Sequence, residues 1–254
     1  MSPRNLSVTC ALPLALLFLL TPMAAVAAAE ESSDVTPELR RVLDGLDAAN
    51  KKVQDVKASV VYLREIPLLD ESQESKGSLL FRKPNLIRVE LGKPRNEEII
   101  TDGKKWWVVS HNDKQVEIYE AASGKGSAEA SFLTFGYGQS SAKLLESYKI
   151  TLIETKAPAA GEKKPTRYRL RFVPRDKTAP ARFARIEVEL ADDLFLPDVI
   201  VLHESEGEIV HTFRLQDIKL NTEVKDKEFN YEPPKGYSVL TPEGAAAAPK
   251  REGP

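Results

Sequence analysis

The chain has 254 residues, and its 36 Lys and Arg residues nearly balance its 38 Asp and Glu residues, which leaves a formal net charge of −2. Because this balance is close to neutral and both signs are interspersed, it argues against nucleic acid or a strongly anionic membrane surface as the partner. Cys10 is the single cysteine, so the fold must be held together by its hydrophobic core rather than by disulfides.

Residues 1–29 have the pattern of a secretory signal peptide. A start with one Arg and no acid is followed by a short apolar run and then by small residues, which predicts cleavage after Ala27 or Ala29. Cys10 precedes the apolar run and would be removed with it. The run is too short and wrongly flanked for a transmembrane helix, although a retained membrane anchor is the alternative interpretation. No later apolar stretch approaches ~18 residues, so we expect the mature protein to be soluble.

Residues 36–53 predict one amphipathic helix. Thr36 is placed to cap it and Pro37 suits its first position. Its apolar residues form a single stripe, which needs a surface to pack against. The stripe consists of Leu39, Val42, Leu43, Leu46, Ala49 and Val53.

Beyond this helix the hydrophobic period changes to two, which is typical of β-strands. About eleven segments alternate at the short spacing of an antiparallel meander. They are residues 56–66, 77–84, 86–91, 97–101, 105–110, 115–119, 148–155, 167–173, 184–190, 198–205 and 208–218. A short helix is expected to begin near Ser140 or Ser141.

These elements predict a mainly β (α+β) fold of one domain, residues 30–240. We expect a single, strongly curved antiparallel sheet that forms an incomplete barrel and is closed by the long N-terminal helix and a short lid helix. Residues 241–254 are rich in Ala and Pro, and we expect them to be disordered.

The two tryptophans of the chain are neighbours in the segment DGKKWWVV, residues 102–109. Asp102-Gly103 predicts a two-residue hairpin turn before the strand. Since adjacent side chains of a strand point to opposite faces, one of Trp106 and Trp107 should face the interior and the other should face outward.

The sequence favours a non-enzymatic protein. His203 and His211 lie in a predicted hairpin that points them to opposite faces, which argues against a metal site and favours a hydrogen-bonded core role for His211. The segment FGYGQSSAK, residues 135–143, lacks the third glycine of a phosphate-binding loop. We therefore predict no catalytic residue, metal ligand or cofactor, although dispersed catalytic carboxylates would leave no mark in the sequence.

The order of four segments after the N-terminal helix resembles that of the LolA-like outer-membrane lipoprotein carriers. These segments are GSLLFRKPNLIRVEL, IITDGKKWWVV, KQVEIYE and FNYEPPKGYSVL, and the resemblance extends from about Glu38 to Leu240. It implies an incomplete barrel whose apolar hollow is closed by helices. It also implies a periplasmic carrier that shields the acyl chains of lipoproteins on the way from the inner to the outer membrane.

The resemblance suggests which residues form this hollow. It places Trp107 and Val109 on the concave face and leaves Trp106 outward. Together with the strand pattern it predicts an apolar ligand-binding face of Leu79, Phe81, Ile87, Val89, Trp107, Val109, Ile186, Val188 and Phe213. Ordinary core under the helices is the alternative interpretation of this set. The predicted lid residues are Phe132, Leu133 and Phe135.

The resemblance also implies a latch, a residue at the end of a strand that holds the lid closed by hydrogen bonds. In the family an arginine before the strand-ending proline bonds to the lid, whereas here Lys83 precedes Pro84 and Arg82 stands one place earlier. Arg82 and Lys83 are therefore the candidate latch residues, and a lysine lacks the planar, multi-donor fork of arginine.

The implied partners are acylated lipoproteins or lipid, with an inner-membrane loading complex and an outer-membrane acceptor as further candidates. No nucleic acid is expected, and the protein is expected to be a monomer. A periplasmic module that senses lipid or lipoprotein and acts on a membrane regulator is the alternative function. A structural envelope protein with a filled core is a third.

Overall fold

The computed structural model describes residues 35–120, 137–175, 183–205, 207 and 209–241. All the described residues belong to one compact unit, Ser32–Pro254. Within the described part, none of the helices is both long enough and apolar enough to cross a membrane.

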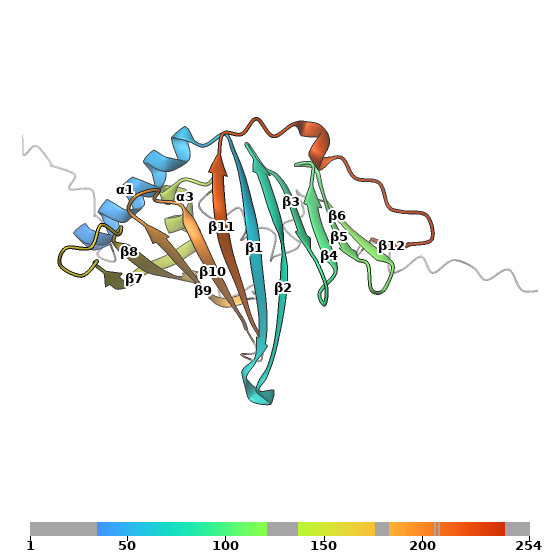
Figure 1. The fold of residues 1–254 in the computed structure, drawn as a ribbon, viewed down its shortest axis with the longest axis horizontal. Coiled ribbons are helices and arrows are strands. Elements are labelled where there is room, and N and C mark those ends of the chain that lie inside the picture. Colours follow the sequence, from blue (N-terminus) through green and yellow to red (C-terminus); the bar gives the residue numbers. More distant parts are fainter. Residues whose placement is uncertain (1–34, 121–136, 176–182, 206, 208, 242–254) are drawn as a thin grey trace, which may run out of the picture. The chain divides into compact units, whose positions relative to one another are not determined.

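One twelve-stranded open sheet is the framework of this unit (Figure 1). Its strand order is β12-β6-β5-β4-β3-β2-β1-β11-β10-β9-β8-β7, and every pair is antiparallel except β12 on β6. The strands are β1 Asp55–Ile66, β2 Glu71–Arg82, β3 Leu86–Leu91, β4 Glu97–Thr101, β5 Lys105–Ser110, β6 Gln115–Glu120, β7 Tyr148–Lys156, β8 Arg167–Pro174, β9 Phe183–Ala191, β10 Pro197–Glu204, β11 Val210–Leu220 and β12 Ser238–Leu240.

The predicted fold class, a mainly β chain with one open antiparallel sheet and two α-helices, is confirmed. The prediction of about eleven strands missed β12, because only three residues of the C-terminal segment pair with β6 and its sequence has no alternation long enough to read.

The long helix is α1, Pro37–Lys52, and it forms for local reasons. The Thr36 hydroxyl accepts a hydrogen bond from the Leu39 N–H at 3.2 Å, and Pro37 occupies the first turn. Its buried residues are Leu39, Val42, Leu43, Leu46 and Asn50. The short helix α3, Ser141–Ser147, begins where the sequence predicted, and Ser140 caps it. Two 3-10 helices complete the described elements, η1 Pro67–Leu69 and η3 Asp226–Phe229.

The two faces of the sheet are covered by different parts of the chain. We call the face that packs against α1 the helix-side face. Figure 1 shows α1 and α3 against the half of the sheet that carries β7 to β11. On the opposite face, residues 221–241, which we call the C-terminal strap, pass over β3 at η3 and end as β12 on β6.

Candidate apolar binding site

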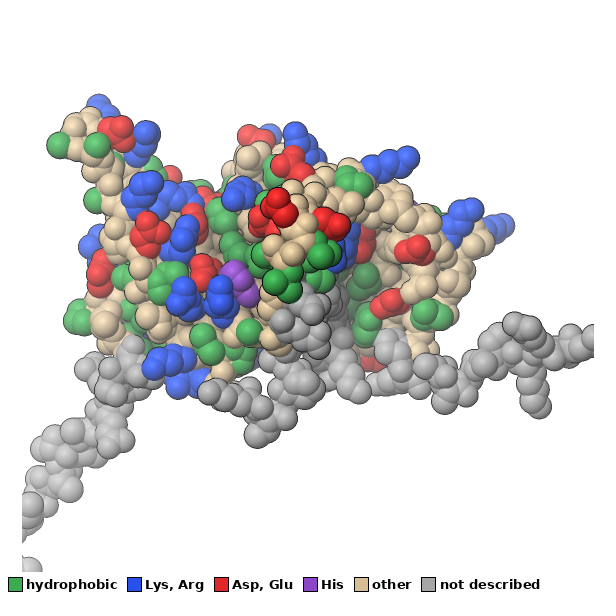
Figure 2. Space-filling model, turned by 90° about the horizontal axis from the view of Figure 1, so that it is seen from below, with side chains coloured by type: hydrophobic (Ala, Val, Ile, Leu, Met, Phe, Trp, Pro, Cys, Tyr) green, Lys and Arg blue, Asp and Glu red, His purple; other side chains and the backbone are tan. Residues whose placement is uncertain are grey.

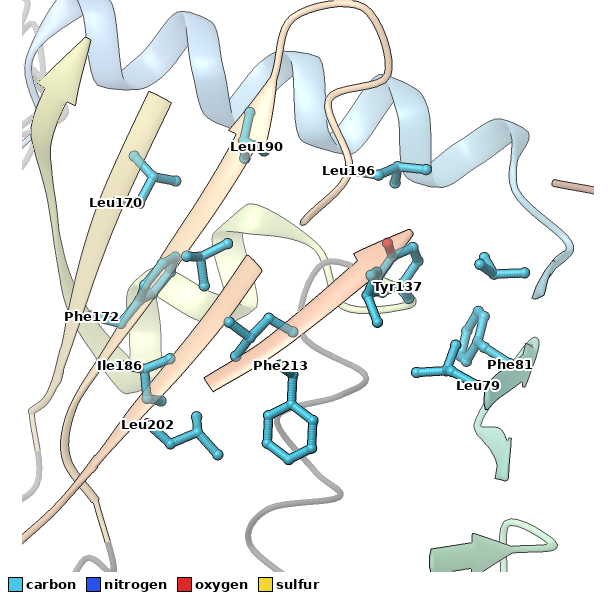
Figure 3. Close-up of a cluster of buried hydrophobic side chains, with 14 of the residues drawn as sticks. Leu79, Phe81, Tyr137, Leu170, Phe172, Ile186, Leu190, Leu196, Leu202 and Phe213 are labelled. Carbon is cyan, nitrogen blue, oxygen red and sulfur yellow. The ribbon is translucent and has the colours of Figure 1, made fainter. Parts of the chain in front are cut away.

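The helix-side face carries a continuous cluster of buried hydrophobic side chains from the sheet and α1 (Figure 3). The register produces it. Leu79 pairs with Val89, and Phe81 pairs with Ile87, so all four project from the same face. Seven of the nine predicted face residues lie in this cluster, each no more than 1 % exposed: Leu79, Phe81, Ile87, Val89, Ile186, Val188 and Phe213. Their binding of a ligand remains a prediction.

The predicted orientation of the two tryptophans is wrong. Trp106 lies in the helix-side cluster, whereas Trp107 and Val109 lie in a second cluster on the opposite face with Ile100 and Val116. The pairing explains it, because Thr101 pairs with both Ile87 and Trp106, which places Trp106 on the face of Ile87. Neither indole is a surface group, since both tryptophans are 8 % exposed.

Both faces of β5 are apolar because the C-terminal strap packs on the outer face and buries it. The Tyr231 ring lies 6.0 Å from that of Trp107, and Tyr237 packs against the same cluster. Burial, followed by the nearby Glu98 carboxylate, raises the pKa of Tyr231 to about 12. Because the strap covers Trp107, alternation in the sequence does not distinguish the inner face of β5 from the outer one.

The Asp102-Gly103 turn is longer than predicted. The last paired residues are Thr101 and Trp106, so four residues connect them instead of two. Asp102 Oδ1 accepts hydrogen bonds from the N–H groups of Lys104 and Lys105, each at 2.8 Å, and this local bonding stabilises the longer turn.

Polar contacts join the two helices at the rim of the helix-side cluster. Asp47 of α1 accepts hydrogen bonds from the N–H and the hydroxyl of Ser141, at 2.8 and 2.6 Å. The side-chain amide of Asn50 donates to the Gln139 carbonyl at 3.0 Å. Since the same helix contributes both residues, α1 and the start of α3 form one connected cover.

Lys83 ties this cover to the sheet, whereas Arg82 does not. The Lys83 ammonium donates to the Asn50 carbonyl in the last turn of α1. Arg82 instead donates to the Val224 carbonyl at 2.7 Å and pairs with Asp226 at 2.8 Å, both in the C-terminal strap. Of the two candidate latch residues, Lys83 therefore has the contact to the helical cover. Its function as a latch remains a prediction.

Tyr137 connects the cover to the middle of the cluster. Its fully buried hydroxyl donates to the Pro197 carbonyl at 2.6 Å, and its ring lies 5.8 Å from that of Phe81. Burial, followed by the Asp198 carboxylate, raises the pKa of the Tyr137 phenol, so the phenol stays neutral. The predicted lid residues Phe132, Leu133 and Phe135 lie outside the described residues.

An apolar cleft of about 330 Å³ lies along α1. The loop between β9 and β10 forms its other wall, where the Phe195 ring packs so closely on Gly45 that an added Cβ would lie 2.5 Å from the ring. The lining residues are Gly45, Ala48, Ala49, Lys52, Val53, Asp193, Leu194, Phe195, Leu196, Leu220 and Asn221. The sequence reasoning did not predict this cleft, because the loop residues show no periodicity that would connect them to the helix.

His211 is held in a buried hydrogen-bonded group. Its Nδ1 lies 2.8 Å from the Tyr62 hydroxyl and its Nε2 lies 3.1 Å from a Glu204 oxygen. The predicted pairings of Leu202 with His211 and of His203 with Val210 are observed, so the two histidines face opposite sides. No group of three or more His, Cys, Asp or Glu in the described part of the chain is placed to hold a metal ion.

Lys83→Met should loosen the C-terminal end of α1. The variant loses a charged donor to the Asn50 carbonyl, and hydrogen bonds from charged groups are typically worth about 1.5–3 kcal/mol. Hydrogen exchange at the amides of residues 47–53 should therefore become faster, whereas Lys83→Arg, which keeps a donor, should retain most of the protection. Unchanged exchange in Lys83→Met would show that packing alone holds the helix.

Taken together, these features define a class of protein: an open sheet whose apolar face is covered by helices attached through a few polar contacts. The model of the family described as outer membrane lipoprotein carrier protein LolA matches residues 67–232, which is more than half of the chain. The chain therefore belongs to the LolA family.

Individual proteins are similar to the chain at low identity. It is 26% identical over 170 residues to an outer-membrane lipoprotein carrier protein of Legionella pneumophila, covering 67% of this chain and 75% of that one. It is 25% identical over 197 residues to the protein of that name in Halorhodospira halophila, covering 76% and 84%. A crystal structure of an uncharacterized conserved protein from Thermus thermophilus aligns with a TM-score of 0.49 and 15% identity, over 80% of this chain and 99% of that one.

Proposed function

We propose that the protein is a periplasmic carrier that shields the acyl chains of lipoproteins while they pass from the inner to the outer membrane. The single observation that carries this proposal is the continuous apolar cluster on the helix-side face, roofed by helices in a chain of the LolA family. Each buried methylene is worth about 0.8 kcal/mol, so an acylated protein needs such a shelter to cross water.

The polar contacts that attach the helical cover are compatible with reversible opening. Lys83, Asp47 and Asn50 hold the helices by a few hydrogen bonds at the rim, whereas the apolar side chains beneath them make no directional bonds. The buried apolar side chains of α1 and α3 belong to the same cluster as the face residues, so we propose that loading requires both helices to move away from the sheet. The cleft along α1 is where we propose that this separation begins.

The two tryptophans supply a matched test of the proposal. A photoreactive residue placed at position 106 should crosslink to acylated lipoproteins in the source cell, identified by mass spectrometry. The same residue at position 107 should not, because it points to the strap and not into the helix-side cluster. The two positions are adjacent in one strand and equally buried, so they differ in the face alone.

Each other outcome decides against part of the proposal. One recurrent non-acylated membrane protein at position 106 would favour a sensing module that acts on a membrane regulator. Free lipid alone would indicate a lipid carrier. Equal acyl adducts at both positions would contradict the assignment of the binding face, and no adduct at position 106 in a folded protein would mean that Trp106 is core.

A further inference from the structure

The tip of the β1–β2 hairpin exposes two leucines. Leu68 is 78 % exposed and Leu69 is 63 % exposed, which are the two largest values among the big hydrophobic side chains of the described residues. Figure 1 shows that this hairpin extends past the ends of the neighbouring strands. The extension is large on the β2 side, where β3 pairs only from Gly77 onward and residues 71–76 pair with β1 alone. On the β1 side β11 pairs up to Glu65, so Ile66 and η1 lie beyond it.

The backbone presents these leucines in a defined turn. They belong to η1, which is closed by a hydrogen bond of 3.4 Å from the Asp70 N–H to the Pro67 carbonyl. Asp70 takes the left-handed conformation with φ of 53°, which ends the turn and starts β2. Because the leucine side chains are largely exposed, they contribute little to the core, so their apolar character has no explanation in folding.

The exposed charged residues next to the tip are mostly acidic. Asp70, Glu71 and Glu74 are exposed on the β2 side of it, and Lys76 is the exposed base on the same strand. Figure 2 views the molecule from the side on which the hairpin ends, and hydrophobic and acidic side chains lie together near the centre of that view. This composition disfavours an anionic lipid surface, and the charges would remain in water or among headgroups if the leucines entered a bilayer.

The small contact area of the apolar tip favours a lipid surface over a protein as its partner. Two leucines provide far less contact area than the roughly 800 Å² per partner of a standard protein interface. A bilayer needs no complementary pocket, and a small apolar insertion gives the weak, reversible attachment that a shuttling protein requires. We infer that Leu68 and Leu69 insert into a zwitterionic lipid surface and form the membrane contact of the carrier.

This inference deepens the proposed function, on which it rests for its biological purpose, because a carrier that releases an acylated cargo at a membrane has to approach the bilayer. The first test is flotation of the purified protein with vesicles of phosphatidylcholine and phosphatidylethanolamine. The double variant Leu68→Glu with Leu69→Glu should bind at least about tenfold more weakly than the unmodified protein. The matched control is Val239→Glu with Leu240→Glu, which adds the same charge at two other exposed apolar residues and should bind as before.

A label at the tip tests insertion directly. Cys10 is the single cysteine, so in a Cys10→Ser background an environment-sensitive fluorophore on Leu68→Cys is unique. Its emission should shift to the blue when these vesicles are added, and a label on Leu240→Cys should not respond. Vesicle binding that is absent, that is unaffected by the tip variant, or that is stronger with phosphatidylglycerol would overturn the inference. So would a photocrosslink from position 68 to a protein in the source cell.

Failure of this inference is distinguishable from failure of the proposed function. Acyl adducts at position 106 with tip-independent vesicle binding would remove the membrane contact and leave the carrier. Tip-dependent vesicle binding without acyl adducts at position 106 would support the membrane contact and remove the carrier.

Discussion

Gly77→Ala is expected to destabilise the protein by about 3 kcal/mol or more in free energy of unfolding. A Cβ at this position would lie 1.8 Å from the Glu90 carbonyl oxygen and 3.1 Å from the Leu91 Cα, so the neighbouring strand must shift as a whole. Overpacking against side chains typically costs 1–3 kcal/mol, and a clash with backbone has less room for relaxation. Denaturant unfolding followed by circular dichroism measures the loss.

The shift of the strand caused by Gly77→Ala should also disturb the candidate binding face. Gly77 begins the pairing of β2 with β3, and the next pairs include Leu79 with Val89 and Phe81 with Ile87. Ser78→Ala, one residue along the same strand, is the control, because it removes one atom and adds none. We expect it to change the free energy of unfolding by less than about 1 kcal/mol. Equal stabilities of the two variants would show that β2 and β3 separate easily.

Asp55→Ala is expected to cost about 2–3 kcal/mol in free energy of unfolding and to release the start of the C-terminal strap. Asp55 is 5 % exposed, and its carboxylate accepts hydrogen bonds from the Thr222 N–H at 2.7 Å, the Thr222 hydroxyl at 3.0 Å and the Glu223 N–H at 3.1 Å. Its removal would leave two backbone donors without their acceptor.

The two tryptophans should respond differently in this variant. Trp107 lies beneath the strap and should become more accessible to an aqueous fluorescence quencher, whereas Trp106 lies on the other face. Replacing Trp106 with Phe isolates the signal of Trp107. Asp226→Ala is the matched control in the strap, because its ion pair with Arg82 is exposed and such pairs contribute about 0–1 kcal/mol. A similar loss of stability in both variants would contradict a specific role for Asp55.

The candidate site shows where sequence reasoning was sufficient and where it was not. Leu79, Phe81, Ile87 and Val89 were placed on one face because two adjoining strands have clear alternation and a short connection. The same reasoning failed for Trp107 and Val109. The resemblance to the family suggested the inner face, and the strap makes the outer face of β5 equally apolar.

The contacts of Arg82 and Lys83 could not be predicted from the sequence, for a related reason. Adjacent residues of a strand end point to opposite faces, but their partners come from segments that are distant in the chain. Lys83 reaches the Asn50 carbonyl of α1, and Arg82 reaches the strap at Val224. Nothing local to these two residues distinguishes a contact to the helices from a contact to the strap.

The sequence by itself determined the elements of this protein, because their signals are local. Thr36 and Pro37 start α1, its apolar stripe sets the buried side, and the period of two marks the strands. Only the tertiary structure decided what covers each face of the sheet. That decision depends on residues 221–241 packing onto strands more than a hundred residues earlier, as the contact of Tyr231 with Trp107 shows, and such long-range packing leaves no periodic pattern in either segment.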